Sequence, residues 1–153
     1  MLASIAAATE ARRPLARLHE LRALCRDHAP TTAAEAIATV VEHSLETVPC
    51  AAVFVPTRTG TTARMISRFK PGIWIASLSR DPAVGQGLAF SYAVHPVDLA
   101  EEPDSWHDFA RAWLREQRLS GAVAMLVAGP STRNPDANHR IEFMRIGGPS
   151  EKV

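Results

Sequence analysis

The segment whose residue types best fit a chemical role is Thr57–Ala63, which reads Thr-Arg-Thr-Gly-Thr-Thr-Ala. It carries four hydroxyl groups and lies between an apolar run, interpreted as a strand, and an expected helix. A helix N-terminus presents unpaired N–H donors and partial positive charge, and Gly60 lets the backbone bend towards a ligand. These features favour a phosphate cradle, although the segment lacks the lysine and glycine spacing of a P-loop. The same residues also fit a Thr-capped helix behind a tight turn.

A second polar segment covers residues 131–138, which read Ser-Thr-Arg-Asn-Pro-Asp-Ala-Asn. It follows another expected strand, so we predict that it lies at the same sheet edge as the first segment. Arg133 would there clamp a phosphate or carboxylate. The simpler alternative is a polar connecting loop. Arg80 also follows an expected strand and would approach an anion, but Asp81 as a helix cap explains most of its segment.

Catalytic and metal-ligating patterns are not evident elsewhere. The six histidines are scattered, and Cys25 and Cys50 lack metal-ligand spacing. The sequence does not single out a Ser-His-Asp or Cys-His arrangement. Trp106 and Trp113 are interpreted as core or interface anchors rather than a stacking platform. We therefore predict no catalytic residue, no metal site and no cofactor in this chain.

Five strands are expected to hold these segments. Wholly apolar runs are typical of strands buried on both faces, and alternation is typical of a half-exposed strand. The expected strands are Ala51–Val55, Ile73–Leu78, Val94–Leu99, Ala122–Ala128 and Arg140–Ile146. Pro96 places the third near an edge, and a short connection favours antiparallel pairing of the last two.

Helices are expected between the strands. A capping-box pattern, Thr32-Ala33-Ala34-Glu35, starts one whose apolar residues recur at helical spacing. Those residues are Ile37, Val40, Val41, Leu45 and Val48. Further helices are predicted over Arg64–Phe69, from Asp81-Pro82 to about Tyr92, and along the stripe Trp106, Phe109, Ala110, Trp113 and Leu114.

The alternation of strands and helices predicts an α/β fold. We expect a doubly wound, mostly parallel five-stranded sheet with an antiparallel edge strand. In such sheets ligands bind beyond the carboxyl ends of the strands, where both polar segments are expected.

Composition limits the function classes. The 153 residues suit one domain, with 46% hydrophobic and 22% charged residues. Lys+Arg is 17 and Asp+Glu is 16, which argues against nucleic-acid binding through a general basic surface. No apolar run approaches the roughly 20 residues of a membrane span, and the first residues lack a signal-peptide pattern. We expect a cytoplasmic protein with neither nucleic acid nor membrane as partner.

The ordered segments resemble the C-terminal α/β domain of pyruvate kinase. That family has an apolar strand, Thr-x-Ser/Thr-Gly-x-Ser/Thr-Ala, a helix, a strand and then Gly-Val-x-Pro-Val. Here Thr57–Ala63 matches the first motif, and Ala93–Val97 matches the second with Ala93 in place of the usual glycine. The resemblance implies a domain over residues 29–149. It also implies a lead-in over 1–28 like the end of the catalytic barrel with its connecting helix, and a tail over 150–153.

In the family this domain is regulatory and contributes a subunit interface. The resemblance implies a phosphorylated effector, either a sugar phosphate or a nucleotide monophosphate, as partner. Its phosphate would be held by Thr57, Thr59, Gly60, Thr61 and Thr62. The effector loop would close over it with Ser131, Thr132, Arg133 and Asn138. In the family, catalysis belongs to the barrel, which binds Mg²⁺ and K⁺. This chain alone is therefore expected to be inactive in the glycolytic reaction. The resemblance also implies that it associates with itself or with a pyruvate kinase catalytic region.

Two alternatives from other functional classes remain. One is a structural or assembly module with no surviving ligand site, in which Arg140–Ile146 pairs with another subunit. The other is a small enzyme acting on phosphate esters, with Asp81, Asp98 or Asp136 as general acid or base.

Overall fold

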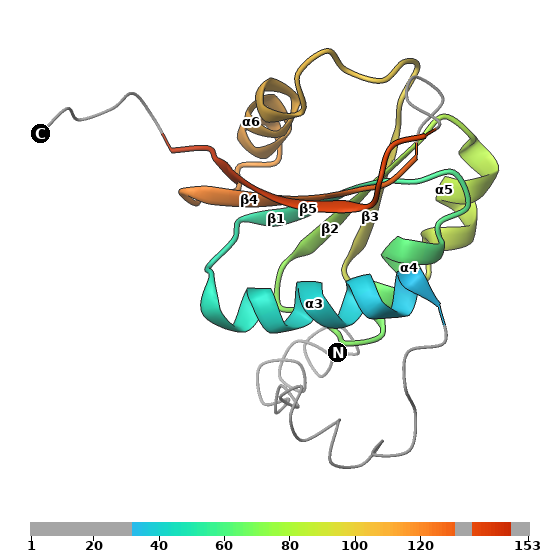
Figure 1. The fold of residues 1–153 in the computed structure, drawn as a ribbon. Helices are drawn as coiled ribbons and strands as arrows, with labels where there is room; N and C mark the ends of the chain where they lie inside the picture. The colour runs from blue at the N-terminus through green and yellow to red at the C-terminus, as the bar shows by residue number, and fades with distance from the viewer. Residues whose placement is uncertain (1–31, 131–135, 148–153) are drawn as a thin grey trace, which may run out of the picture.

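The computed structural model describes residues 32–130 and 136–147. Helices and strands alternate through most of this part (Figure 1). In chain order they are α3 (Ala33–Thr47), β1 (Ala52–Pro56), α4 (Thr61–Ser67), β2 (Trp74–Ser79), α5 (Pro82–Leu88), β3 (Val94–Asp98), α6 (Trp106–Glu116), β4 (Val123–Ala128) and β5 (Arg140–Arg145). The predicted lead-in over 1–28 and tail over 150–153 lie outside the described residues, and the domain limits of 29–149 stay a prediction.

The strands form one sheet in the order β3-β2-β1-β4-β5. β1 pairs in parallel with β2 and β4, and β2 pairs in parallel with β3. Of the strands in residues 32–130 and 136–147, only β5 runs antiparallel, against β4. The predicted fold class is confirmed, including the position of β3 at an edge. Parallel pairing requires long crossovers, and these are supplied by the helices.

Two apolar cores lie on opposite faces of the sheet. Side chains alternate along β1, so that Val53 and Val55 enter one core while Ala52 and Phe54 enter the other. The first core also includes side chains of α3, α4 and α5, whereas α6 covers the second (Figure 1). The ring of Phe54 meets that of Trp113 edge-on at 5.3 Å. This double covering explains why β1, β2 and β4 show no polar alternation.

Helix α3 begins as its sequence predicts, because the Thr32 hydroxyl accepts a hydrogen bond from the Glu35 N–H at 3.2 Å. Its expected apolar stripe is wrong at Val40, which is 52% exposed. Val40 precedes the buried Val41 by one residue and is therefore turned about 100° from it around the helix. The core-facing stripe is correspondingly narrower than the sequence suggested.

Two other helix limits differ from expectation, and both affect loops at the sheet. α4 begins at Thr61 rather than Arg64, so two of the predicted loop threonines form its first turn. α5 ends at Leu88 rather than near Tyr92. Its Gly85 and Gly87 weaken helix propensity, and the Ser91 N–H donates to the Leu88 carbonyl at 2.8 Å in a turn that leads to β3.

Ala93 takes a left-handed backbone conformation, with φ of 56°, just before β3. This is the position at which the resembled family usually has glycine, the residue that adopts such a φ without steric cost.

Within the described residues, no helix is both long and apolar enough to cross a membrane.

Candidate functional site

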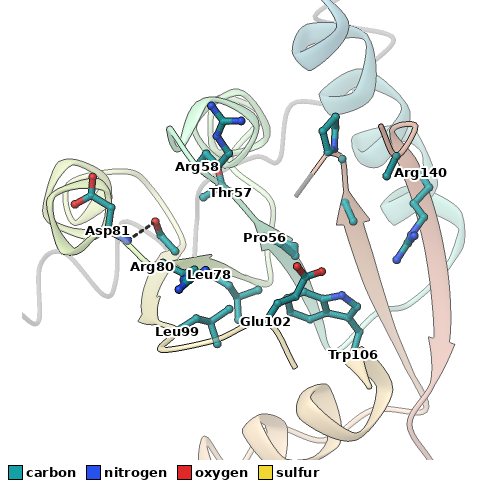
Figure 2. Close-up of a pocket in the computed structure, with 15 residues that line it drawn as sticks. Pro56, Thr57, Arg58, Leu78, Arg80, Asp81, Leu99, Glu102, Trp106 and Arg140 are labelled. Carbon is teal, nitrogen blue, oxygen red and sulfur yellow. Dashed lines mark hydrogen bonds between the residues drawn. The ribbon is translucent and has the colours of Figure 1, made fainter. Parts of the chain in front are cut away.

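A cavity of about 270 Å³ lies at the sheet edge where the parallel strands end. Because β1, β2, β3 and β4 run in the same direction, the connections that follow them meet at this edge. β5 runs the opposite way, so its first residue, Arg140, also lies here. Figure 2 shows side chains from these connections around the cavity.

The β1–α4 connection provides Thr57 and Arg58 to the cavity wall. The Thr57 hydroxyl accepts a hydrogen bond from the Gly60 N–H at 2.8 Å, which closes a tight turn. The hydroxyls of Thr59 and Thr61 are hydrogen-bonded to each other at 2.9 Å. The N-cap residue of α4 is Gly60, and no side chain among the described residues caps this helix. The donors of its first turn are therefore not taken by a capping side chain.

Gly60 has a packing role that its sequence context did not reveal. Its φ is 75°, and a Cβ atom added there would lie 3.0 Å from Leu88 Cδ1 of α5. Both the backbone conformation and the limited space beside Leu88 therefore favour glycine. Gly60, Thr59, Thr61 and Thr62 are not among the residues that line the cavity.

The β2–α5 connection places Arg80 and Asp81 in the cavity wall. Asp81 caps α5 as predicted, because its Oδ1 accepts from the Ala83 N–H at 2.9 Å. The Asp81 N–H donates in turn to the Ser79 hydroxyl at 3.1 Å, the bond dashed in Figure 2. In the described part of the chain, no carboxylate forms an ion pair with Arg58 or Arg80.

The opposite wall contains Glu102, Trp106 and Arg140, none of which sequence reasoning assigned to a site. Trp106 does act as the expected anchor, since its ring lies 6.0 Å from that of Phe109. It lines the cavity as well (Figure 2). Arg140 Nε lies 2.7 Å from Glu142 Oε1. Strand direction is the feature of the sequence prediction that could have found these residues. β3 ends and β5 begins at this sheet edge, so residues 99–106 and Arg140 lie there.

The second polar segment is described only from Asp136 onwards. Ser131, Thr132 and Arg133 lie outside the described residues. Asn138 is exposed and does not line the cavity, whereas the neighbouring Ala137 does. The predicted closure of this loop over a ligand stays a prediction.

The candidate acids for an enzyme are distributed over separate places. Asp81 is occupied as the cap of α5, while Asp98 and Asp136 are exposed and do not line the cavity.

Burial raises the pKa of the Cys50 thiol, which disfavours its nucleophilic thiolate. Burial, followed by the charge of Glu46, raises the pKa of the Glu42 carboxyl on α3. Across residues 32–130 and 136–147, no group of three or more His, Cys, Asp or Glu side chains is placed to hold a metal ion.

Comparison with known proteins identifies relatives of most of the described part of the chain. The family described as "Pyruvate kinase, alpha/beta domain" matches residues 35–138. A pyruvate kinase of Thermococcus litoralis is 42% identical over 103 residues, covering 66% of this chain and 22% of the relative. A pyruvate kinase of Lactococcus lactis is 29% identical over 121 residues, covering 76% of this chain and 23% of the relative.

Solved structures give the same result. Cryptosporidium parvum pyruvate kinase in complex with ADP superposes with a TM-score of 0.69 and 27% identity, over 78% of this chain and 25% of that one. Another structure of pyruvate kinase from the same organism gives a TM-score of 0.66 and 25% identity. The chain thus spans about a quarter of the length of these relatives. By the extent of the family match and the agreement in fold, the chain belongs to the pyruvate kinase C-terminal α/β domain family.

Proposed function

We propose that this chain is an allosteric effector-binding domain of a pyruvate kinase, and that its ligand is a phosphorylated small molecule. The carrying observation is the cavity, which brings Thr57 and Arg58 of the hydroxyl-rich β1–α4 connection together with Arg80 of the next connection. Neither arginine has a carboxylate partner in the described part of the chain. Guanidinium groups and free backbone donors are the groups that bind phosphate in proteins.

In this proposal the phosphate lies against Thr57, Thr59, Gly60, Thr61 and Thr62, with Arg80 supplying positive charge from the next connection. The remainder of the effector occupies the cavity towards Trp106. Residues 131–138 close over it. The phosphoryl transfer of glycolysis, from phosphoenolpyruvate to ADP, is assigned to a catalytic barrel with its Mg²⁺ and K⁺, so the 153-residue chain assayed alone transfers no phosphate. The proposal also places the protein in the cytoplasm, as the sequence predicts.

The test is a thermal-shift and calorimetric panel on the full 153-residue chain. The panel contains fructose 1,6-bisphosphate, sugar monophosphates, AMP and inorganic phosphate. A ligand at about 100 times its Kd stabilises the chain by about 2.7 kcal/mol, which raises Tm by about 5–11 °C for a domain of this size. We expect one or more phosphorylated metabolites to produce such a shift in Tm. Inorganic phosphate should produce a much smaller one.

Arg80→Gln makes the panel specific to the cavity. Losing a charge-assisted hydrogen bond costs about 1.5–3 kcal/mol, so the affinity for the effector should fall by about 10- to 160-fold. Arg111→Gln is the matched control, because Arg111 is exposed on α6 and does not line the cavity. Equal affinities of both variants and the wild type would contradict the proposed site, and an unresponsive wild type would contradict the function.

The alternative function is subunit assembly through β5, and the exposure of this strand favours it. β5 is the outermost strand at its edge, and Phe143 on it is 48% exposed. The other edge strand, β3, contains Pro96, which lacks a backbone donor. β5 would then pair with β5 of a second copy across a two-fold axis. Light scattering at high concentration tests this, and a strictly monomeric chain would exclude it.

A further inference from the structure

The charged groups around the cavity are unevenly distributed. Arg58 and Arg80 follow β1 and β2, on the side of the hydroxyl-rich connection. In Figure 2 the Arg58 side chain extends away from Glu102 and Trp106, which leaves Arg80 as the nearer unpaired cation. Arg140 lies across the cavity and forms an ion pair with Glu142, with 2.7 Å between Nε and Oε1. The side opposite the proposed phosphate position therefore lacks an unpaired cation within the described residues.

Glu102 lines that opposite side with a free carboxylate. It is half-buried in the connection between β3 and α6, and it lines the same cavity as Pro56 and Trp106 (Figure 2). Among the described residues, no hydrogen bond or ion pair to Glu102 is present. A carboxylate is an acceptor only, so it suits the hydroxyl or amino groups of a ligand. It also repels a phosphate brought close to it, and more strongly in a partly enclosed site than in water.

We propose that Glu102 is a specificity-determining residue that selects monophosphate effectors and excludes bisphosphates. This inference rests on the proposed function, in which the first phosphate lies at the β1–α4 connection. The ligand class is a phosphomonoester of a hydroxylated skeleton, whether a sugar phosphate or a nucleoside monophosphate. Its hydroxyl groups donate to Glu102, and its carbon skeleton or ring lies against Trp106. Selection then arises from a repulsive group placed against the wrong ligand as well as from attraction to the right one.

The test compares fructose 6-phosphate with fructose 1,6-bisphosphate by titration calorimetry on the full chain. These ligands differ by one phosphate, so their ratio of affinities reports on the second phosphate alone. We expect the wild type to bind the monophosphate at least tenfold more tightly. AMP and ribose 5-phosphate, measured in parallel, distinguish a nucleotide from a sugar as the source of the phosphomonoester.

Glu102→Gln keeps the size of the side chain and removes its charge. In this variant the Kd of the bisphosphate should fall at least tenfold, while that of the monophosphate changes less than about threefold. Glu101→Gln is the matched control, because the neighbouring Glu101 is exposed and does not line the cavity. It should leave both Kd values unchanged.

The outcomes separate this inference from the proposed function. A wild type that binds the bisphosphate more tightly, or a Glu102→Gln variant with an unchanged ratio, overturns the role of Glu102 and leaves effector binding standing. A chain that binds none of the four phosphorylated compounds overturns both.

Discussion

Two neighbouring connections, β1–α4 and β2–α5, leave the same sheet edge, but the helices that follow them begin with different N-caps. In β2–α5, the Asp81 side chain caps the helix and Pro82 occupies its first turn. In β1–α4, the cap is Gly60, which offers no side chain to the helix. Both connections line the cavity, through Thr57 and Arg58 in one and Ser79–Asp81 in the other. One helix start is thus capped by a side chain of the protein, whereas the other has no side-chain cap.

The largest expected effect comes from forcing a side chain into the open connection. Gly60→Val combines a positive φ, which costs a non-glycine residue about 1–2 kcal/mol, with an overpacking cost of about 1–3 kcal/mol against Leu88. We expect a loss of about 2–5 kcal/mol in the free energy of unfolding, measured by urea denaturation. Gly72→Val is the control, because a Cβ there meets no atom within 4 Å. Equal losses in both variants would show that Gly60 has no special role.

A smaller effect is expected from removing the cap of the closed connection. Asp81→Ala should cost about 1 kcal/mol, the usual value of a lost N-cap, and lower Tm by about 2–4 °C. Because it also removes a negative charge from the cavity wall, the affinity for a phosphorylated effector should stay equal or rise. Asp81→Asn retains an N-cap acceptor and should keep most of the stability. A large loss of effector affinity in Asp81→Ala would mean that the two connections do not differ as described.

The smallest expected effect compares two left-handed positions. Gly60 adopts its positive φ freely, whereas Ala93 adopts a φ of 56° at a steric cost. Ala93→Gly should relieve about 1–2 kcal/mol of strain, while the greater entropy of the unfolded chain costs about 0.5–1 kcal/mol. The net gain in stability is therefore about 0–1.5 kcal/mol. Ala89→Gly is the control, because Ala89 has a helical φ of −57° and should lose stability instead. Denaturant midpoints of the two variants that move in the same direction would contradict this account.

The sequence predicted the sheet well because burial on both faces leaves a clear record in β1, β2 and β4, and Pro96 marks β3 as an edge strand. It predicted helix starts where capping residues such as Thr32 and Asp81 specify them. It placed the start of α4 three residues late, since Gly60 provides no side-chain cap to mark it. Glu102, Trp106 and Arg140 were missed as cavity residues because they are brought together only by strand direction across the sheet.

The most direct test of the account is an amide NMR titration of the full chain with the phosphorylated compound that binds best in the panel. If the phosphate lies at the open connection, the N–H signals of Thr61 and Thr62 shift strongly. The Ala83 N–H, already bonded to Asp81 at 2.9 Å, should move little. Shifts that leave Thr61 and Thr62 unchanged, or that are as large at Ala83, would contradict the central claim that the β1–α4 connection receives the effector phosphate.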